Sequence, residues 1–150
     1  EQKNLKSYDI IPLLFISLTI IAGTFVSGMD AGLVYNTFPY MGEGIIPIEY
    51  GNLGFIDPFE NPVTAQFHHR LFASITLIII IMYSIHYIIK NPLNLRIILL
   101  LFAIICQFII GIFTLLYSVP IILGAMHQFV GVLLFLSALW VLHSPKKNTF

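Results

Sequence analysis

Residues 64–89 read TAQFHHRLFASITLIIIIMYSIHYII, and the rest of the chain is best understood from this stretch. Beyond Arg70 it is predominantly apolar, and it exceeds the roughly 20 residues that a helix needs to cross a hydrocarbon core of about 30 Å. Its head, from Gln66 to Arg70, carries an amide, two imidazoles and a guanidinium. Because the bilayer core offers no water to replace lost hydrogen bonds, polar side chains in such a place are candidates for function.

The composition indicates an integral membrane protein. Of 150 residues, 58% are hydrophobic and only 9% are charged, whereas charged residues make up about 25% of a typical soluble domain. The formal net charge is zero, which argues against a basic surface for nucleic acid. Cys106 is the only cysteine, so an intrachain disulfide and a cysteine-based metal site are excluded.

Four apolar segments are long enough to span a bilayer. We predict these spans at residues 10–33, 64–89, 95–117 and 121–142. Pro92 and Pro120 interrupt the short connections after the second and third spans, and short connections produce antiparallel neighbours. The expected fold is therefore all-α, a single antiparallel bundle of four transmembrane helices that comprises residues 1–150.

Basic residues mark one side of this bundle. They precede the first span, flank the turn between the second and third, and follow the fourth: Lys3, Lys6, Lys90, Arg96, Lys146 and Lys147. The positive-inside rule assigns this side to the cytoplasm or the mitochondrial matrix. The long loop at residues 35–63 then lies on the outer side, and its aromatic and apolar content predicts an ordered cap.

His69 and His127 lie at the same predicted depth. They are about five and six residues inside the second and fourth spans, which corresponds to roughly 8–9 Å below the outer boundary at 1.5 Å per residue. Two helices of one bundle that offer imidazole at one level suit a haem with two axial histidines. Arg70, the one basic residue on the outer side, is expected to pair with a haem propionate.

Small residues accompany these histidines. Gly111, Gly124 and Gly131 allow a backbone or a flat macrocycle to approach closely. Gly28 and Gly32 form a GxxxG step, which by itself indicates tight helix packing. The sequence leaves the role of the nearby acid Asp30 open between proton handling and a plain interfacial position.

Other interpretations of the histidines stay open at this point. Two histidines near a membrane interface also serve as hydrogen-bonded structural residues. His68 lies 100° around the helix from His69 and is therefore expected on the surface or behind the ligand. His86 and His143, at similar spacings further along the same two helices, suggest a second haem as in di-haem cytochromes b, although both lie near the water boundary.

Three stretches carry a resemblance to a known family. They are GTFVSGMDAGLVYNTFPYMGE at residues 23–43, FENPVTAQFHHR at residues 59–70, and QFIIGIFTLLYSVP at residues 107–120, which continues to His127 and Gln128. Together they touch all four spans in order. The chain resembles the haem A synthase family of the Cox15 and CtaA type, and in particular the branch that lacks a cysteine pair in the outer loop.

The resemblance implies an oxidoreductase that converts haem O to haem A by oxidising a ring methyl group to a formyl group. Family members usually have eight helices in two related halves, and this chain resembles the C-terminal half. The implied axial ligands of the iron are His69 and His127, with Arg70, Gln66 and Gln128 around them. Gln66 stands where the first half of relatives has a catalytic glutamate, which implies that this half holds haem b as a cofactor.

The expected partners are haem O and haem A, an N-terminal half or a second copy of the chain, an electron donor, haem O synthase and the lipid bilayer. The isoleucine-rich composition favours a bacterial plasma membrane, with the mitochondrial inner membrane as the alternative. Two other functions compete with this interpretation. One is an electron-transfer cytochrome of the b type, with two histidine ligands or two haems, and the other is a membrane scaffold without enzymatic activity.

Overall fold

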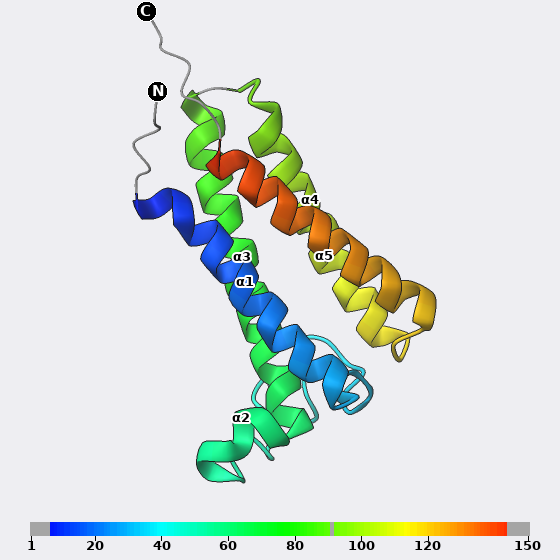
Figure 1. The fold of residues 1–150 in the computed structure, drawn as a ribbon. Coiled ribbons are helices and arrows are strands. Elements are labelled where there is room, and N and C mark those ends of the chain that lie inside the picture. Colours follow the sequence, from blue (N-terminus) through cyan, green and yellow to red (C-terminus); the bar gives the residue numbers. More distant parts are fainter. Residues whose placement is uncertain (1–6, 91, 144–150) are drawn as a thin grey trace, which may run out of the picture.

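The computed structural model describes residues 7–90 and 92–143. Four long helices run between its two ends (Figure 1): α1 at Ser7–Gly28, α3 at Pro62–Lys90, α4 at Leu95–Leu116 and α5 at Ile121–Leu142. All four are long and apolar enough to cross a membrane. The described residues form no strand beyond one isolated bridge, between Met41 and Gly44. The predicted all-α membrane bundle is therefore confirmed.

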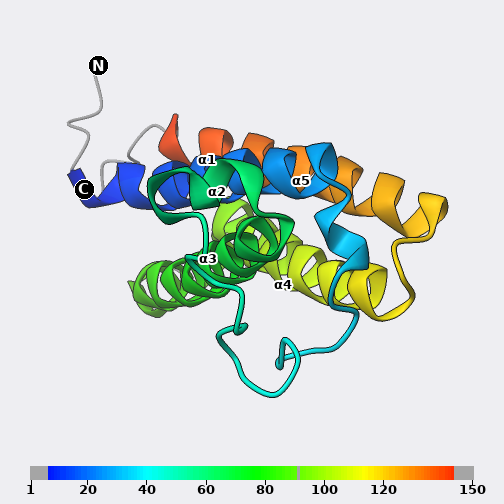
Figure 2. The same ribbon diagram turned by 90° about the horizontal axis from the view of Figure 1, so that it is seen from below.

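The helices form two antiparallel pairs. α1 packs along α3 and α4 packs along α5, with further contacts between α1 and α5 and between α3 and α4. Seen from below, α1 and α5 lie on one side and α3 and α4 on the other (Figure 2). The end that carries the loop between α1 and α3 is called the outer end below. Lys3, Lys6, Lys146 and Lys147, which support the predicted sidedness, lie outside the described residues.

The first helix ends earlier than predicted. α1 stops at Gly28 rather than at residue 33, and Ala31–Leu33 form a separate 3₁₀ turn, η1. The reason is the backbone of Asp30, whose φ of 50° and ψ of 26° lie in the left-handed region, where an α-helix cannot continue. Asp30 is exposed and makes no capping hydrogen bond, so it has the place of an interfacial turn residue.

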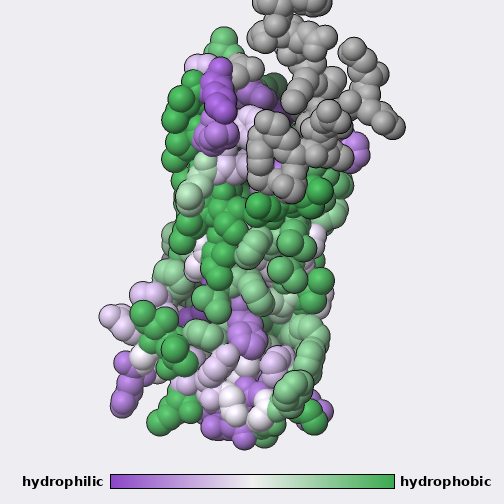
Figure 3. Space-filling view, turned by 90° about the vertical axis from the view of Figure 1, so that its left-hand side faces the viewer, coloured by the Kyte–Doolittle hydropathy of each residue, from purple (hydrophilic) through white to green (hydrophobic). Residues whose placement is uncertain are grey.

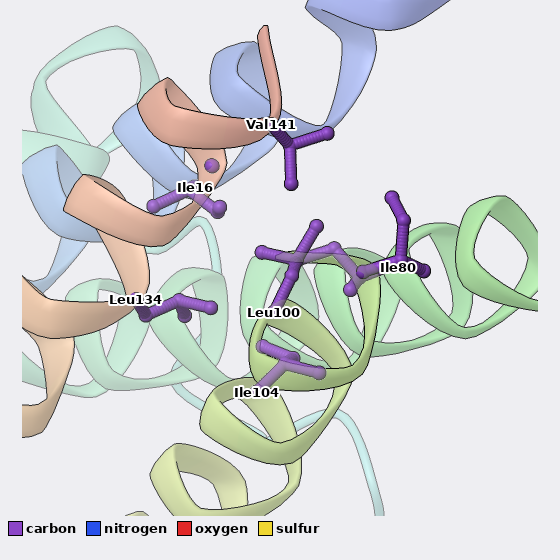
Figure 4. Packing of buried hydrophobic residues seen from close by; sticks show 8 residues of the cluster. Ile16, Ile80, Leu100, Ile104, Leu134 and Val141 are labelled. Atoms are coloured by element: carbon purple, nitrogen blue, oxygen red, sulfur yellow. The ribbon is translucent and has the colours of Figure 1, made fainter. Parts of the chain in front are cut away.

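The apolar core lies in the inner half of the bundle. Side chains from all four long helices meet there, including Ile16, Ile80, Leu100, Leu134 and Val141 (Figure 4). In the outer half, by contrast, residues 105–116 of α4 and 121–133 of α5 include no buried side chain. In α4 and α5 the buried side chains of the described residues are therefore confined to the inner half.

The surface has the pattern of a membrane protein. Apolar side chains form a broad central band on the face shown in Figure 3, and polar side chains gather toward the two ends. Such a band matches the hydrocarbon layer of a bilayer, with polar residues in the two interfaces.

Asp57 organises the outer loop, which contains two short turns of helix, η2 at Gly54–Ile56 and α2 at Asp57–Glu60. Its buried carboxylate accepts hydrogen bonds from the backbone N–H groups of Gly51 and Leu53 and from Nδ2 of Asn61, each at 2.9 Å. The hydroxyl of Thr64 donates a further one. Burial raises the pKa of this carboxyl, but the four hydrogen bonds outweigh that effect and hold the pKa well below its ordinary value.

We expect Asp57→Asn to loosen the loop at neutral pH. An amide offers one acceptor oxygen instead of two and turns its own N–H₂ toward other donors, which leaves buried groups unpaired. Amide hydrogens of Gly51 and Leu53 are expected to exchange with solvent at least about tenfold faster in the variant. Glu60→Gln, a change at a neighbouring exposed acid, is the matched control and leaves these rates unchanged.

The same carboxylate predicts a pH dependence. Because the pKa of Asp57 is lowered in the folded state, its stabilising effect is complete above the ordinary pKa of about 3.9 and is lost as the pH falls below it. Exchange at Gly51 and Leu53, corrected for the intrinsic rate, should therefore rise on acidification in the wild type. An equally steep rise in Asp57→Asn would contradict the role given to this residue.

Candidate haem site

His69 projects from α3 toward α1. Its ring lies against Gly23, where an added Cβ atom would come within 3.1 Å of the ring atom Cε1. Its Nδ1 lies 3.1 Å from the carbonyl oxygen of Thr19, which suits an Nδ1–H donor. A histidine held in this way keeps Nε2 unprotonated and fixed in direction, which is the usual arrangement behind a metal-binding imidazole.

His127 projects from α5 and lies against α4. An added Cβ atom at Gly111 would come within 2.9 Å of its Cε1, so only glycine at this position lets the ring lie so close to α4. The amide nitrogen Nε2 of Gln107 is 3.3 Å from Nε2 of His127. Nδ1 of His127 is buried and has no hydrogen-bond partner.

The centres of the two imidazole rings lie at a distance that is compatible with one iron between them. Their ring centres are 6.3 Å apart and their planes are inclined at 85°. Since a ring nitrogen binds a metal at about 2.0–2.1 Å and lies about 1 Å from the ring centre, two imidazoles on opposite sides of one ion have centres about 6 Å apart. The equal depth predicted from the sequence thus brings His69 and His127 together in space.

A bare metal ion does not suit this pair. No group of three or more His, Cys, Asp or Glu side chains that could hold a metal is found in the described ranges 7–90 and 92–143. Two protein ligands leave most of the coordination sphere empty, whereas a porphyrin supplies four nitrogens and needs one ligand on each side. The donor set therefore fits an iron porphyrin.

Unpaired polar atoms around the histidines point the same way. Five buried side-chain atoms of the described residues lack a hydrogen bond, and four belong to the helix segments at this level: Gln66 Oε1, Arg70 Nε, Gln107 Oε1 and His127 Nδ1. A buried polar atom without a partner is costly and calls for an explanation. A bound group with a polar edge supplies one.

Arg70 and Gln66 bind the outer loop. The terminal nitrogens of Arg70 donate to the carbonyl oxygens of Thr37 at 2.8 Å and Tyr35 at 2.7 Å. Nε2 of Gln66 donates to the same Tyr35 carbonyl at 3.0 Å. Both side chains thus fasten the first turn of the loop to α3, a role that the sequence did not indicate. The expected contact of Arg70 with a propionate stays a prediction, for which Nε is the available donor.

The remaining candidates lie elsewhere. His68 points away from His69 and contacts Tyr50, Phe67 and Phe72, as its 100° rotation around the helix predicts. Gln128 is exposed, and its expected place near the haem stays a prediction.

The second histidine pair has the character of interfacial residues. His86 and His143 are both exposed near the inner end. Nε2 of His86 lies 3.1 Å from Nζ of Lys90, and Nδ1 of His143 lies 2.9 Å from the Leu139 carbonyl oxygen of its own helix. These positions do not favour a second haem.

The sequence did not identify Gln107 as a residue of the site. It lies on α4 with its amide against His127 and against Gly131, where an added Cβ atom would be 3.2 Å from its Nε2. Its position in the third quoted stretch, four residues before Gly111, was the available signal. Residues four apart lie on one face of a helix, so Gly111 and Gln107 both face α5.

Comparisons with known proteins identify the family of the chain. The family model COX15-CtaA, described as cytochrome oxidase assembly protein, matches residues 1–139. The "Heme A synthase" of Wolbachia pipientis wMel is 38% identical over 151 residues, which cover 97% of this chain and 41% of the relative. That of Rickettsia bellii strain OSU 85-389 is 42% identical over 157 residues, or 99% of this chain and 46% of the relative. The chain thus spans less than half the length of these relatives. No solved structure matches it.

Proposed function

Because the chain belongs to the COX15-CtaA family of cytochrome oxidase assembly proteins, we propose that it forms part of a haem A synthase and holds one haem b between His69 and His127. The observation that carries the proposal is the 6.3 Å separation of the two imidazole ring centres. The chain is a multi-pass protein of the bacterial inner membrane. In the proposed enzyme, haem O is the substrate and one of its ring methyl groups is oxidised to the formyl group of haem A.

The proposal divides the work between two halves of a longer protein. This chain covers 41% and 46% of two relatives, which leaves room for a second four-helix unit that binds the substrate haem. Bound haem b supplies reversible one-electron reduction of iron. Gln66, three residues before His69, is an amide whose Nε2 is engaged by the Tyr35 carbonyl, so it cannot move a proton as a carboxylate in this place would. The half therefore serves as an electron relay.

The residues of this chain hold the two ligands in place. The Thr19 carbonyl fixes the tautomer and direction of the His69 ring, and Gly23 and Gly111 allow both rings to lie close against neighbouring helices. Arg70 and Gln66 fasten the first turn of the outer loop to α3 near the same level. A rigid site of this kind suits electron transfer, because little reorganisation accompanies a change of charge on iron.

The test is a reduced-minus-oxidised visible spectrum of the purified chain, with a pyridine haemochrome assay of its haem type and content. We expect a low-spin, six-coordinate b-type spectrum with about one haem per chain. A folded chain that takes up no haem, alone and after co-expression with the remainder of a family member, would overturn the proposed site.

We expect Arg70→Ala to weaken haem retention more than His68→Ala does. Arg70 both anchors the outer loop and carries the buried, unpaired Nε that can meet a propionate, whereas His68 lies on the other side of α3. The measurement is the rate of haem transfer to an excess of apomyoglobin, with at least about a fivefold increase expected for Arg70→Ala, or ~1 kcal/mol. The opposite order of the two variants would contradict the role of Arg70.

A further inference from the structure

A recess lies between α1 and α3, and neither His69 nor His127 is among its lining residues. It is an apolar groove between the outer parts of these two helices, covered at its outer end by α2. Its lining includes Ala22, Phe25, Phe59, Ala65, His68 and Phe72. Phe25 and Phe59 meet edge to face with ring centres 5.5 Å apart, which closes the groove toward the outer loop. Both helices cross the membrane here, so the groove opens toward lipid.

The size of the groove suits one six-membered ring. Its volume is about 150 Å³. An apolar protein cavity of ~150 Å³ accepts a benzene molecule, and aromatic walls add favourable edge-to-face contacts. A ring that enters from the bilayer can leave a hydrocarbon tail outside, along the exposed side chains of Leu18 and Ile21.

His68 gives this groove a hydrogen-bonding group, which a groove that only packs against lipid does not need. Its Nε2 lies 3.1 Å from the hydroxyl of Tyr50. When the phenol donates to Nε2, the ring proton lies on Nδ1, for which the described residues supply no hydrogen-bond partner. By contrast, the other groove of the bundle, between α1 and α5, is lined by Ser17 and apolar residues and contains no histidine.

We propose that the groove binds the ring of a lipid-soluble hydroquinone or quinone, with His68 as its hydrogen-bond partner, and that this ring is the electron donor of the haem site. With the ring proton on Nδ1, this nitrogen donates to a quinone oxygen. In the other tautomer Nε2–H donates to the Tyr50 hydroxyl, and Nδ1 accepts from a hydroquinone hydroxyl. His68 and His69 are consecutive residues of α3, with Cα atoms about 3.8 Å apart, and only His68 lines the groove, so a ring bound there would be close to the proposed haem site. The donor role rests on the proposed haem site, whereas binding of the ring does not.

The reaction proposed for the groove is the two-electron oxidation of a hydroquinone. Oxidation of the hydroquinone to the quinone breaks two O–H bonds and releases two electrons and two protons. Haem held by His69 and His127 would accept these electrons one at a time, with its iron reoxidised between the two transfers by the substrate side of the proposed enzyme. The two protons are released to the outer aqueous side, where the hydrogen-bonded pair of His68 and Tyr50 lies and Tyr50 is exposed.

Photolabelling tests the binding directly. The chain is reconstituted in phosphatidylcholine nanodiscs and irradiated with an azido-benzoquinone that carries a decyl tail. We expect saturable labelling of residues 18–25 and 65–72, competed by unlabelled decyl-benzoquinone and not by decanol. Labelling should fall at least about tenfold in Ala22→Phe, which fills the groove, and in His68→Leu, which keeps its shape but removes the hydrogen bond. Val132→Phe fills the other groove and is the matched control that leaves labelling unchanged.

Anaerobic reduction tests the donor role. Decyl-hydroquinone should reduce the haem of the wild type at least about tenfold faster than that of His68→Leu, while dithionite reduces both at the same rate. Labelling that does not saturate, that decanol competes equally, or that persists in both groove variants overturns the quinone site and leaves the haem proposal intact. Specific labelling of a chain that binds no haem retains the ring site and overturns its donor role together with the proposed haem site.

Discussion

His127→Ala is expected to abolish the six-coordinate haem spectrum of the chain, and His69→Ala should do the same. Each imidazole would supply one of the two axial bonds, and the neighbouring His68 points away from the pair, against Tyr50 and Phe72. We expect a haem content at least about tenfold lower, or a five-coordinate, high-spin spectrum for any haem that stays bound. The measurements are the visible spectrum and the pyridine haemochrome yield per chain.

The controls are His86→Ala and His143→Ala. Both residues are histidines on the same two helices, but they are exposed near the inner end. Neither change should alter the haem content or the spectrum. If His69→Ala and His127→Ala both keep a normal six-coordinate spectrum, the ligand assignment fails. Loss of haem in the His86 or His143 variant would instead favour the second haem of a di-haem cytochrome.

The main lines of the architecture follow from the sequence because the bilayer imposes strict requirements. Apolar length predicts the four spans, and three of them differ from the structure by no more than two residues at either end. The common level of His69 and His127 follows from counting residues from the outer boundary, since the rise per residue of a helix is constant. Depth is therefore predictable before any contact is known.

Rotation and local backbone conformation are not predictable in the same way. The end of α1 at Gly28 depends on the left-handed backbone of Asp30, which a residue count does not reveal. The contact between Gln107 and His127 requires the relative rotation of α4 and α5. The sequence likewise suggested a propionate as the partner of Arg70. The partners of its terminal nitrogens in the structure are backbone carbonyl groups of the loop, which no sequence pattern identifies.

The burial and the partners of the acidic residues were likewise not predictable from the sequence. Asp30 attracted attention as an acid near the membrane boundary, yet it is exposed. The buried acid of the bundle's inner end is Asp9, whose carboxylate accepts hydrogen bonds from Tyr87 at 2.5 Å and Tyr83 at 3.2 Å. These phenols come from α3, more than 70 residues along the chain. Asp9 therefore joins α1 to α3 through partners that only the tertiary structure identifies.

Gly111→Ala is expected to separate haem binding from folding. The added methyl group would lie 2.9 Å from Cε1 of His127, which is closer than two carbon atoms approach without bonding. The imidazole is the mobile partner in this contact, so we expect it to turn away from the position it needs beside the iron. The helix itself gains, because alanine is favoured over glycine in a helix interior by about 1 kcal/mol.

Thermal unfolding of Gly111→Ala without haem should therefore be no easier than that of the wild type, while haem affinity falls at least about tenfold, or ~1.4 kcal/mol. Gly124→Ala is the matched control, since its added methyl group meets only Val119 Cγ1 at 4.0 Å and lies one turn from His127 on the same helix. Gly23→Ala, with a 3.1 Å approach to Cε1 of His69, should give an intermediate loss. Equal haem affinity in Gly111→Ala and Gly124→Ala would show that the close approach of α4 to His127 is not what positions this ligand. A parallel loss of haem and thermal stability in Gly111→Ala would assign the glycine to helix packing instead.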